Sequence, residues 1–308
     1  MNRRHFIRTL AAGTAAASLA PTAWASQPEP LFFRISLAQW SLHRALFARK
    51  LTTLEFPQTA REAYGIGAVE YVDTFFYRKV KKAGYIAELL RRSQDAGVYN
   101  HLIMIDTAGP LADASSAKRI QAAENHQRWI ETAKALGCAA IRVNLKGDGS
   151  AAELRNRSAD SLRLLAEFAA PLGISVLVEN HGGYSSDAAW LASVMRQVNL
   201  PNCGTLPDFG NFCISGGWGS TEGKCDNAYD RYQGVDELMP FAKGVSAKSY
   251  RFAADGSEAT MDYLRLLRIV KAAGYRGYIG VEYEGNALPE PEGIRATKAL
   301  LEQAGASA

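Results

Sequence analysis

The sequence predicts a single-domain α/β protein, a closed (β/α)8 TIM barrel, and three observations favour this fold. The chain has 308 residues, of which 47% are hydrophobic and 21% charged, so it can bury a large core. Short runs rich in β-branched and aromatic residues alternate with longer helical stretches. There are eight such units, and eight favour a closed barrel over an open doubly wound sheet, which commonly has five or six strands.

The predicted elements follow one another without a linker or a change of composition, so we expect one domain over residues 26–308. Helical stretches are expected over residues 85–96, 124–136, 152–170, 188–198 and 261–273. Turns such as Leu136-Gly137-Cys138 end a helix and open the next strand. The eight strands should begin near Phe33, Ala68, His101, Ala140, Ser175, Cys203, Gly244 and Tyr278.

The first 25 residues are predicted to be a signal peptide rather than part of the fold. Arg3 and Arg4 precede a modestly apolar, alanine-rich run, which ends in the small-x-small pattern Ala23-Trp24-Ala25. The paired arginines resemble a bacterial twin-arginine export signal, and a general secretory signal is the alternative. We therefore expect a periplasmic protein without stable membrane insertion, because the apolar run is too short for a convincing membrane span.

Charge and cysteine content narrow the function classes further. The formal charge of the whole chain is +4, and three of its arginines belong to the predicted signal peptide. The remaining near-neutral balance argues against a nucleic-acid-binding protein. The four cysteines have no zinc-like spacing, and Cys213 and Cys225, which flank a glycine-rich loop, are the best candidates for a disulfide.

Acidic side chains follow three neighbouring predicted strands of the barrel. Glu179 ends the fifth strand, Asp208 the sixth and Glu282 the eighth. The carboxyl ends of barrel strands meet at one face, where active sites of this fold lie. Three acids in one pocket repel each other unless a cation or shared protons lie between them, so a hard divalent ion is expected there.

These strand ends resemble the xylose-isomerase-like barrels grouped as sugar phosphate isomerases and epimerases, including ketose 3-epimerases. The resemblance spans the chain after residue 25 and rests on Val-Glu-Asn-His, Pro-Asp-Phe-Gly-Asn and Gly-Val-Glu-Tyr-Glu-Gly, which contain Glu179, Asp208 and Glu282. It implies Mn²⁺ or Mg²⁺ held by Glu, Asp, His and Glu from the fifth to eighth strands. This chain matches the three acids of that set.

The fourth ligand of the family pattern is absent. The seventh strand of the family carries His-x-His-x-Lys-Asp, whereas Ser246 stands here in place of the second histidine. The metal is then held by the three carboxylates with water or His181, or it is weakened or lost. Lys248, two residues from Ser246 and on the same face of the strand, could place an ammonium group near the acids.

Other polar and aromatic residues near strand ends are candidates for binding a substrate. A glycine-rich segment from Ser215 to Tyr232 is expected to be either a lid, with Arg231 and Tyr232 reaching a substrate, or a surface loop. The candidate substrate-binding residues are Trp40, His43, Glu70, Asn144, His181 and Asn211.

The resulting prediction is a sugar isomerase or epimerase that removes a proton next to a carbonyl, with Glu179, Glu282 and Lys248 as catalytic residues. Its substrate would be a small sugar or glycoside, and the chain could form a homo-oligomer. A lyase or hydratase of 3-keto-glycosides, which eliminates a group after the same proton abstraction, is the first alternative. A glycosidase is less well supported, and a periplasmic sugar-binding protein without chemistry remains a third possibility.

Overall fold

The computed structural model describes residues 30–308, and the predicted signal peptide at residues 1–25 lies outside them. In the described part, eight parallel strands form one sheet in the order β6-β5-β4-β3-β2-β1-β8-β7. The parallel bridges Thr205↔Ala242 and Asp208↔Ser246 join the two end strands, so the sheet curls into a barrel. The strands are β1 (Arg34–Ala38), β2 (Ala68–Val72), β3 (Tyr99–Met104), β4 (Ala140–Val143), β5 (Ser175–Glu179), β6 (Cys203–Leu206), β7 (Val245–Ser249) and β8 (Tyr278–Tyr283). The predicted (β/α)8 barrel is thus confirmed.

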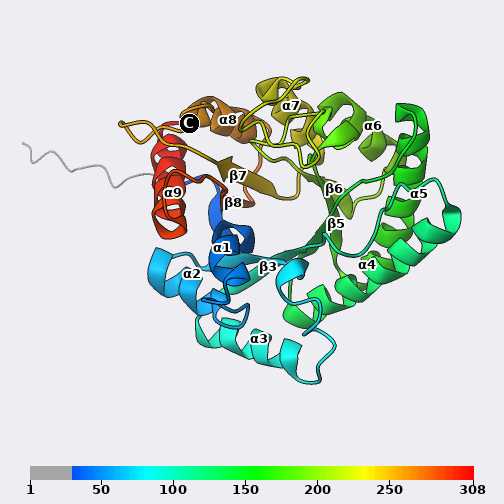
Figure 1. The fold of residues 1–308 in the computed structure, drawn as a ribbon, viewed down its shortest axis with the longest axis horizontal. Helices are drawn as coiled ribbons and strands as arrows, with labels where there is room; N and C mark the ends of the chain where they lie inside the picture. Colours follow the sequence, from blue (N-terminus) through cyan, green and yellow to red (C-terminus); the bar gives the residue numbers. More distant parts are fainter. Residues whose placement is uncertain (1–29) are drawn as a thin grey trace, which may run out of the picture. The chain divides into compact units, whose positions relative to one another are not determined.

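The helices surround the strands (Figure 1). They are α1 (His43–Phe47), α2 (Phe56–Tyr64), α3 (Tyr85–Asp95), α4 (Ser116–Leu136), α5 (Ala151–Ala169), α6 (Ala188–Val198), α7 (Arg231–Leu238), α8 (Tyr263–Ala272) and α9 (Glu290–Ser307).

All five predicted helices are present, but the predicted range 124–136 was too short. Helix α4 begins at Ser116 rather than near residue 124, and the Ser115 hydroxyl accepts a hydrogen bond from the Lys118 amide at its start. Helices α1, α2, α7 and α9 were not predicted. Of these, α7 has only eight residues and follows a long polar loop, so its sequence shows little periodicity.

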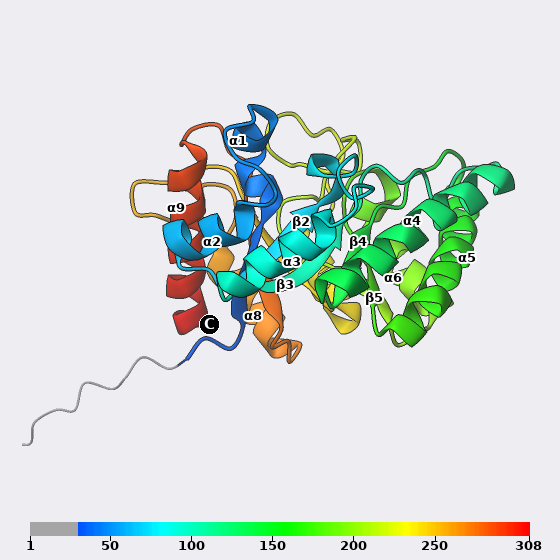
Figure 2. The ribbon, with the colours of Figure 1, turned by 90° about the horizontal axis from the view of Figure 1, so that it is seen from below.

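The barrel interior contains a small set of apolar side chains and, beside them, charged ones. Side chains alternate between the two faces of a strand, so Ala140 and Arg142 both point into the barrel, as do Leu177 and Glu179. Arg142 and Glu179 thus bring charge to the inner face near the carboxyl ends of β4 and β5. Figure 2 shows the barrel from the side, with α1 at one end. The apolar side chains are Ala38, Val72, Leu102, Met104, Ala140, Leu177 and Leu206.

The segment after β6 is cross-linked as the sequence predicted, because Cys213 and Cys225 form a disulfide. Cys138 and Cys203 are free thiols. Among residues 30–308, no helix combines the length and apolar character that crossing a membrane requires.

Candidate active site

Three buried carboxylates meet at the carboxyl end of the barrel. One oxygen each of Glu179, Asp208 and Glu282 lies within 4.8 Å of the others. The Glu179 Oε2 and Asp208 Oδ2 atoms are buried, and each faces a cation, since Arg142 Nε lies 2.8 Å from the first and Lys248 Nζ lies 3.7 Å from the second. Three carboxylates this close together need positive charge between them, and oxygen donors are what Mg²⁺ and Mn²⁺ prefer. This cluster could therefore hold a divalent ion.

The remaining carboxylate oxygens are fixed by neighbouring protein groups. The Asp208 Oδ1 atom accepts hydrogen bonds from the backbone amides of Gly210 (2.7 Å) and Asn211 (2.8 Å). The Asn211 side chain donates to Glu179 Oε1 at 3.1 Å. Ser246, which replaces the histidine of the family pattern, donates to Glu282 Oε2 at 2.7 Å. Each acid is thus held in one orientation through one of its two oxygens.

Two cationic side chains lie within the acidic cluster. Arg142 on β4 places its Nε 2.8 Å from Glu179 Oε2, and its Nη1 lies 2.7 Å from Asp106 Oδ1. The Lys248 ammonium lies 3.7 Å from both Asp208 Oδ2 and Glu282 Oε1. These pairs reduce the repulsion between the acids, but with Asp106 and Glu284 included the carboxylates still outnumber the cations.

Burial dominates the protonation of these groups. It raises the pKa of Glu179 well above the usual value, although Arg142 opposes the shift. It also raises the pKa of Asp208 to about 6, against the attraction of Lys248. Burial alone would lower the pKa of Lys248, but Asp208, Glu282 and Glu284 raise it well above its usual value. Lys248 is therefore a permanent cation, and Glu179 and Asp208 are poised to carry a proton.

A cavity of about 470 Å³ opens above the cluster, which is a typical size for a small-molecule site. Several predicted site residues line it, and two tryptophans stand among its polar groups. The lining comprises Trp40, Val72, Thr74, Asp106, Arg142, His181, Asn211, Trp218, Ser220, Lys248, Glu282 and Glu284.

The predicted substrate-binding residues fall into two groups. Trp40, His181 and Asn211 line the cavity. Asn144 lies beside it, with its Oδ1 atom 2.9 Å from His181 Nδ1. Burial lowers the pKa of His181 well below its usual value, and the neighbouring Arg142 lowers it further, so this imidazole is neutral.

His43 and Glu70 are not brought to the cavity. His43 stacks beside Trp40, with 5.1 Å between ring centroids, and its Nδ1 lies 2.8 Å from the Trp40 carbonyl oxygen. Glu70 points into the barrel interior, where Ser36 donates a 2.6 Å hydrogen bond to it. Burial raises the pKa of Glu70 to about 7. His43 and Glu70 are each within three residues of a residue that lines the cavity, Trp40 and Val72. Their own side chains nevertheless pack against other partners.

Three charged residues of the site, Asp106, Arg142 and Glu284, were not among the predicted site residues. Asp106 lies two residues after β3, and the same strand-end rule that selected Glu179 would have found it. Arg142 lies in the middle of an apolar strand sequence, Ala140–Val143, and is only 3% exposed. An arginine in a strand gives no indication of its partner, so its pairing with Glu179 emerges only in the folded barrel.

The predicted lid residues Arg231 and Tyr232 bind the protein itself. Arg231 donates to the Phe209 carbonyl oxygen at 2.9 Å and to the Thr221 hydroxyl at 3.0 Å. The Tyr232 hydroxyl accepts from the Asp262 amide at 3.1 Å. Neither lines the cavity, so they brace the long segment after β6. The residue of this segment that does reach the cavity with a large side chain is Trp218.

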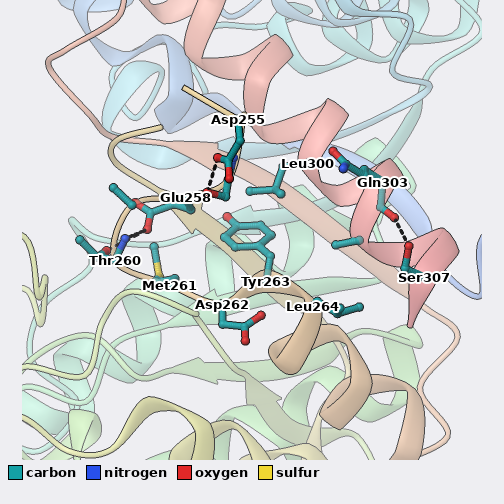
Figure 3. A pocket seen from close by; sticks show the side chains of 13 residues that line it. Asp255, Glu258, Thr260, Met261, Asp262, Tyr263, Leu264, Leu300, Gln303 and Ser307 are labelled. Atoms are coloured by element: carbon teal, nitrogen blue, oxygen red, sulfur yellow. Dashed lines mark hydrogen bonds between the residues drawn. The ribbon is translucent and has the colours of Figure 1, made fainter. Parts of the chain in front are cut away.

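A second groove, of about 570 Å³, lies between the segment after β7 and helix α9 (Figure 3). Its acidic groups serve local structure. Glu258 accepts hydrogen bonds from three backbone amides, Asp255 accepts from the Ser257 amide and hydroxyl, and Asp262 caps helix α8. With its carboxylates occupied in this way, the groove is a weaker candidate than the barrel mouth.

Residues 58–304 match the family described as xylose isomerase-like TIM barrel. The chain belongs to this family. The match includes β2 to β8 and all the charged residues of the cluster.

Several solved structures share the fold of the chain at low sequence identity. A D-psicose 3-epimerase is 13% identical, covers 88% of this chain and 99% of its own, and superposes with a TM-score of 0.67. A 3-keto-D-glucoside 4-epimerase from E. coli is 18% identical, covers 88% of this chain and 99% of its own, and has a TM-score of 0.64. A D-tagatose 3-epimerase-like protein is 17% identical, covers 88% and 97%, and has a TM-score of 0.66.

A short segment also resembles a curated protein. The C-glycoside deglycosidase alpha subunit of Arthrobacter globiformis is 39% identical over 54 residues. The match spans 18% of this xylose isomerase-like barrel and 15% of the deglycosidase subunit. The similarity is therefore limited to a short segment of each chain.

Proposed function

We propose that this protein is a sugar isomerase or epimerase that removes and returns a proton on a carbon next to a carbonyl group. The observation that carries the proposal is the buried Glu179, Asp208 and Glu282 cluster, with Lys248 in contact with two of its members, below a cavity of about 470 Å³. Opposed carboxylates can exchange a proton with carbon, and adjacent cations stabilise the charge that develops on the carbonyl oxygen.

The contacts favour different roles for the two glutamates. Glu282 lines the cavity and is the better placed to meet a substrate carbon. Glu179 lies deeper, and its raised pKa suits a carboxyl that holds a proton at neutral pH and returns it. Lys248 and Arg142 supply permanent positive charge for an enediolate oxygen. His181 and Asn211 offer hydrogen-bonding groups for sugar hydroxyls.

A divalent ion fits the donor set of this site. Glu179, Asp208 and Glu282 would hold it, and all three are oxygen ligands, which suits Mg²⁺ or Mn²⁺ better than Zn²⁺. When bound, such an ion would polarise the carbonyl group of the substrate. Lys248 and Arg142 compete with it for the same oxygens, and Ser246 offers a hydroxyl where the family pattern has an imidazole.

A second candidate is β-elimination from a 3-keto-glycoside. The same proton abstraction next to carbon 3 would expel the group at carbon 1. The shared fold of the 3-keto-D-glucoside 4-epimerase and the segment similar to a C-glycoside deglycosidase subunit both favour a keto-glycoside substrate. A sugar-binding protein without chemistry is the remaining alternative, and buried acids that repel one another argue against it.

Export to the periplasm is part of the proposal. The twin-arginine pattern and the Cys213–Cys225 disulfide both support an oxidising compartment. We also propose that the partner of this chain is a small sugar or glycoside rather than a nucleic acid. The possible homo-oligomer stays a prediction.

The experiment that tests the function follows a carbon-bound proton in heavy water. Ketohexoses and methyl 3-keto-β-glucoside are incubated with the protein in D2O and followed by NMR. Deuterium should enter next to the carbonyl group with the wild type and not with Glu282→Gln. A new epimer identifies the first function, and release of methanol identifies the elimination. Absence of exchange, of a new epimer and of released methanol with every ketose and keto-glycoside would contradict both.

A further inference from the structure

The loop that follows β6 is fixed to the barrel mouth at several points. The Cys213–Cys225 disulfide closes its base. The Cys213 amide donates to the Gly219 carbonyl oxygen at 2.8 Å, and the Ile214 amide donates to the Asn227 carbonyl oxygen at 2.8 Å. The loop between the two cysteines is therefore fixed by a disulfide and by backbone hydrogen bonds.

The tip of this loop lies directly against the end of β5. A Cβ atom built on Gly182 would come within 2.6 Å of the carbonyl oxygens of Gly216 and Gly217. A Cβ atom on Gly219 would come within 2.5 Å of the Gly182 nitrogen. Both Gly182 (φ 89°) and Gly219 (φ 82°) also have a left-handed backbone, so these positions require glycine. The close approach places the loop beside His181, at the cavity.

Trp218 is the aromatic side chain that this loop presents to the cavity. Its ring lies against two residues from neighbouring strand ends, with the Lys146 Nζ 3.1 Å from the ring centroid and the His181 ring 5.1 Å away. Even so, Trp218 is 55% exposed, among the largest exposed fractions of any big apolar side chain in the described chain. A tryptophan that is oriented by its neighbours but left uncovered is suited to stack on a ligand.

We propose that Trp218 forms an outer subsite that stacks on a second ring of the substrate, either the aglycone or the second sugar of a glycoside, and that the Cys213–Cys225 disulfide holds this subsite in place. The inference rests on the proposed function and refines its substrate class. The reacting sugar would lie over Glu282 and Lys248, near Trp40. Trp218 lines the same cavity as Trp40, so a second ring attached to this sugar could reach Trp218.

The size and rigidity of the site favour this substrate class. A cavity of about 470 Å³ is in the range that encloses drug-sized molecules, so it has room beyond a single sugar ring. Since the loop is already ordered by the disulfide and by its packing on Gly182, little conformational entropy is lost when a ring stacks on Trp218.

The test measures binding without turnover, so that it does not depend on the reaction. Phenyl β-D-glucoside and methyl β-D-glucoside are titrated by calorimetry into the wild type, Trp218→Ala, Trp218→Phe and Cys225→Ser. Ile120→Ala, which removes another exposed apolar side chain on α4, is the control. The two ligands share the sugar and differ in the second ring.

The wild type should bind the phenyl glucoside about five- to tenfold more tightly than the methyl glucoside, which is the range of an aromatic stacking contact. Trp218→Ala should abolish this preference and leave the Kd of the methyl glucoside within about twofold. Trp218→Phe should keep most of the preference, and Cys225→Ser should weaken the phenyl glucoside selectively.

Three results would overturn the subsite. The first is equal affinity of the wild type for the two glucosides, and the second is an unchanged preference in Trp218→Ala. The third is an equal loss of affinity for both glucosides in Trp218→Ala, which would mean that Trp218 contributes to the cavity without contacting the second ring. Failure of the proposed function looks different. In that case the ligand preference would hold while no keto-sugar shows deuterium exchange, epimerisation or elimination.

Discussion

Lys248 and Glu282 are register partners on the neighbouring strands β7 and β8, and the Lys248 Nζ lies 3.7 Å from Glu282 Oε1. The same ammonium lies 3.7 Å from Asp208 and 3.2 Å from Glu284. A single buried cation therefore offsets one acid on β8 and two in the segments that follow β6 and β8, and it does so at the mouth of the barrel. This arrangement leads directly to the first prediction.

Lys248→Met should destabilise the protein, because it leaves Asp208 and Glu282 buried without their cation. Loss of one partner from a buried pair costs about 3 kcal/mol or more. Urea unfolding at pH 7 measures the change in the free energy of unfolding. Lys298→Met is the matched control, since it breaks the surface pair with Glu302 (2.7 Å) and should change that free energy by less than about 1 kcal/mol. Equal effects of the two substitutions would contradict the role of Lys248.

Glu179→Gln should abolish turnover and keep the fold. The amide has the same size, and Arg142 retains its 2.7 Å contact with Asp106, so no charge is left without a partner. Loss of an acid–base group lowers kcat/KM by about 100-fold or more. Steady-state kinetics and thermal unfolding are measured together, with Glu302→Gln on the surface of α9 as the control. Full activity in Glu179→Gln would remove this residue from the mechanism.

The carboxylate cluster should bind one divalent ion per chain. Calorimetric titration with Mn²⁺ and Mg²⁺ after dialysis against a chelator measures the affinity, and elemental analysis gives the stoichiometry. Asp208→Asn should weaken binding at least about tenfold, because it removes a charged oxygen ligand. Asp255→Asn, in the groove near α9, should bind as the wild type does. If both variants bind equally well, or the wild type binds no ion, Asp208 is not a ligand.

Acid should destabilise the fold through two buried histidines that do not line the cavity. Burial lowers the pKa of His101 and of His126 to about 4, below the usual value of about 6.5. The folded state therefore resists protonation that the unfolded state accepts. The stabilising contribution is present above pH 6.5 and is lost as the pH falls toward 4.

The loss amounts to about 3 kcal/mol for each imidazole. Urea unfolding of the wild type and of His101→Phe between pH 7 and pH 4 measures it. Both ring nitrogens of His101 lack hydrogen-bond partners, so phenylalanine preserves its contacts and should reduce the pH dependence. An unchanged pH dependence in this variant would show that His101 is not a source of the acid sensitivity.

Much of the fold and part of the site could be predicted from the sequence, because strands, helices and strand ends are recognised from short stretches of residues. Eight alternating strand and helix patterns determined the barrel, and the strand ends identified Glu179, Asp208 and Glu282. The glycine-rich spacing between Cys213 and Cys225 indicated the disulfide that is observed.

Tertiary structure alone decided which side chains meet. The apolar sequence around Arg142 gives no sign that its guanidinium contacts Glu179, which is 37 residues away and on the next strand. His43 and Glu70 are close in sequence to cavity residues, yet packing turns them toward Trp40 and Ser36. Trp218 reaches the cavity because two glycines allow the loop to approach β5. Strand ends are local properties of a chain, whereas contacts between strands depend on register, twist and close packing, which exist only in the folded barrel.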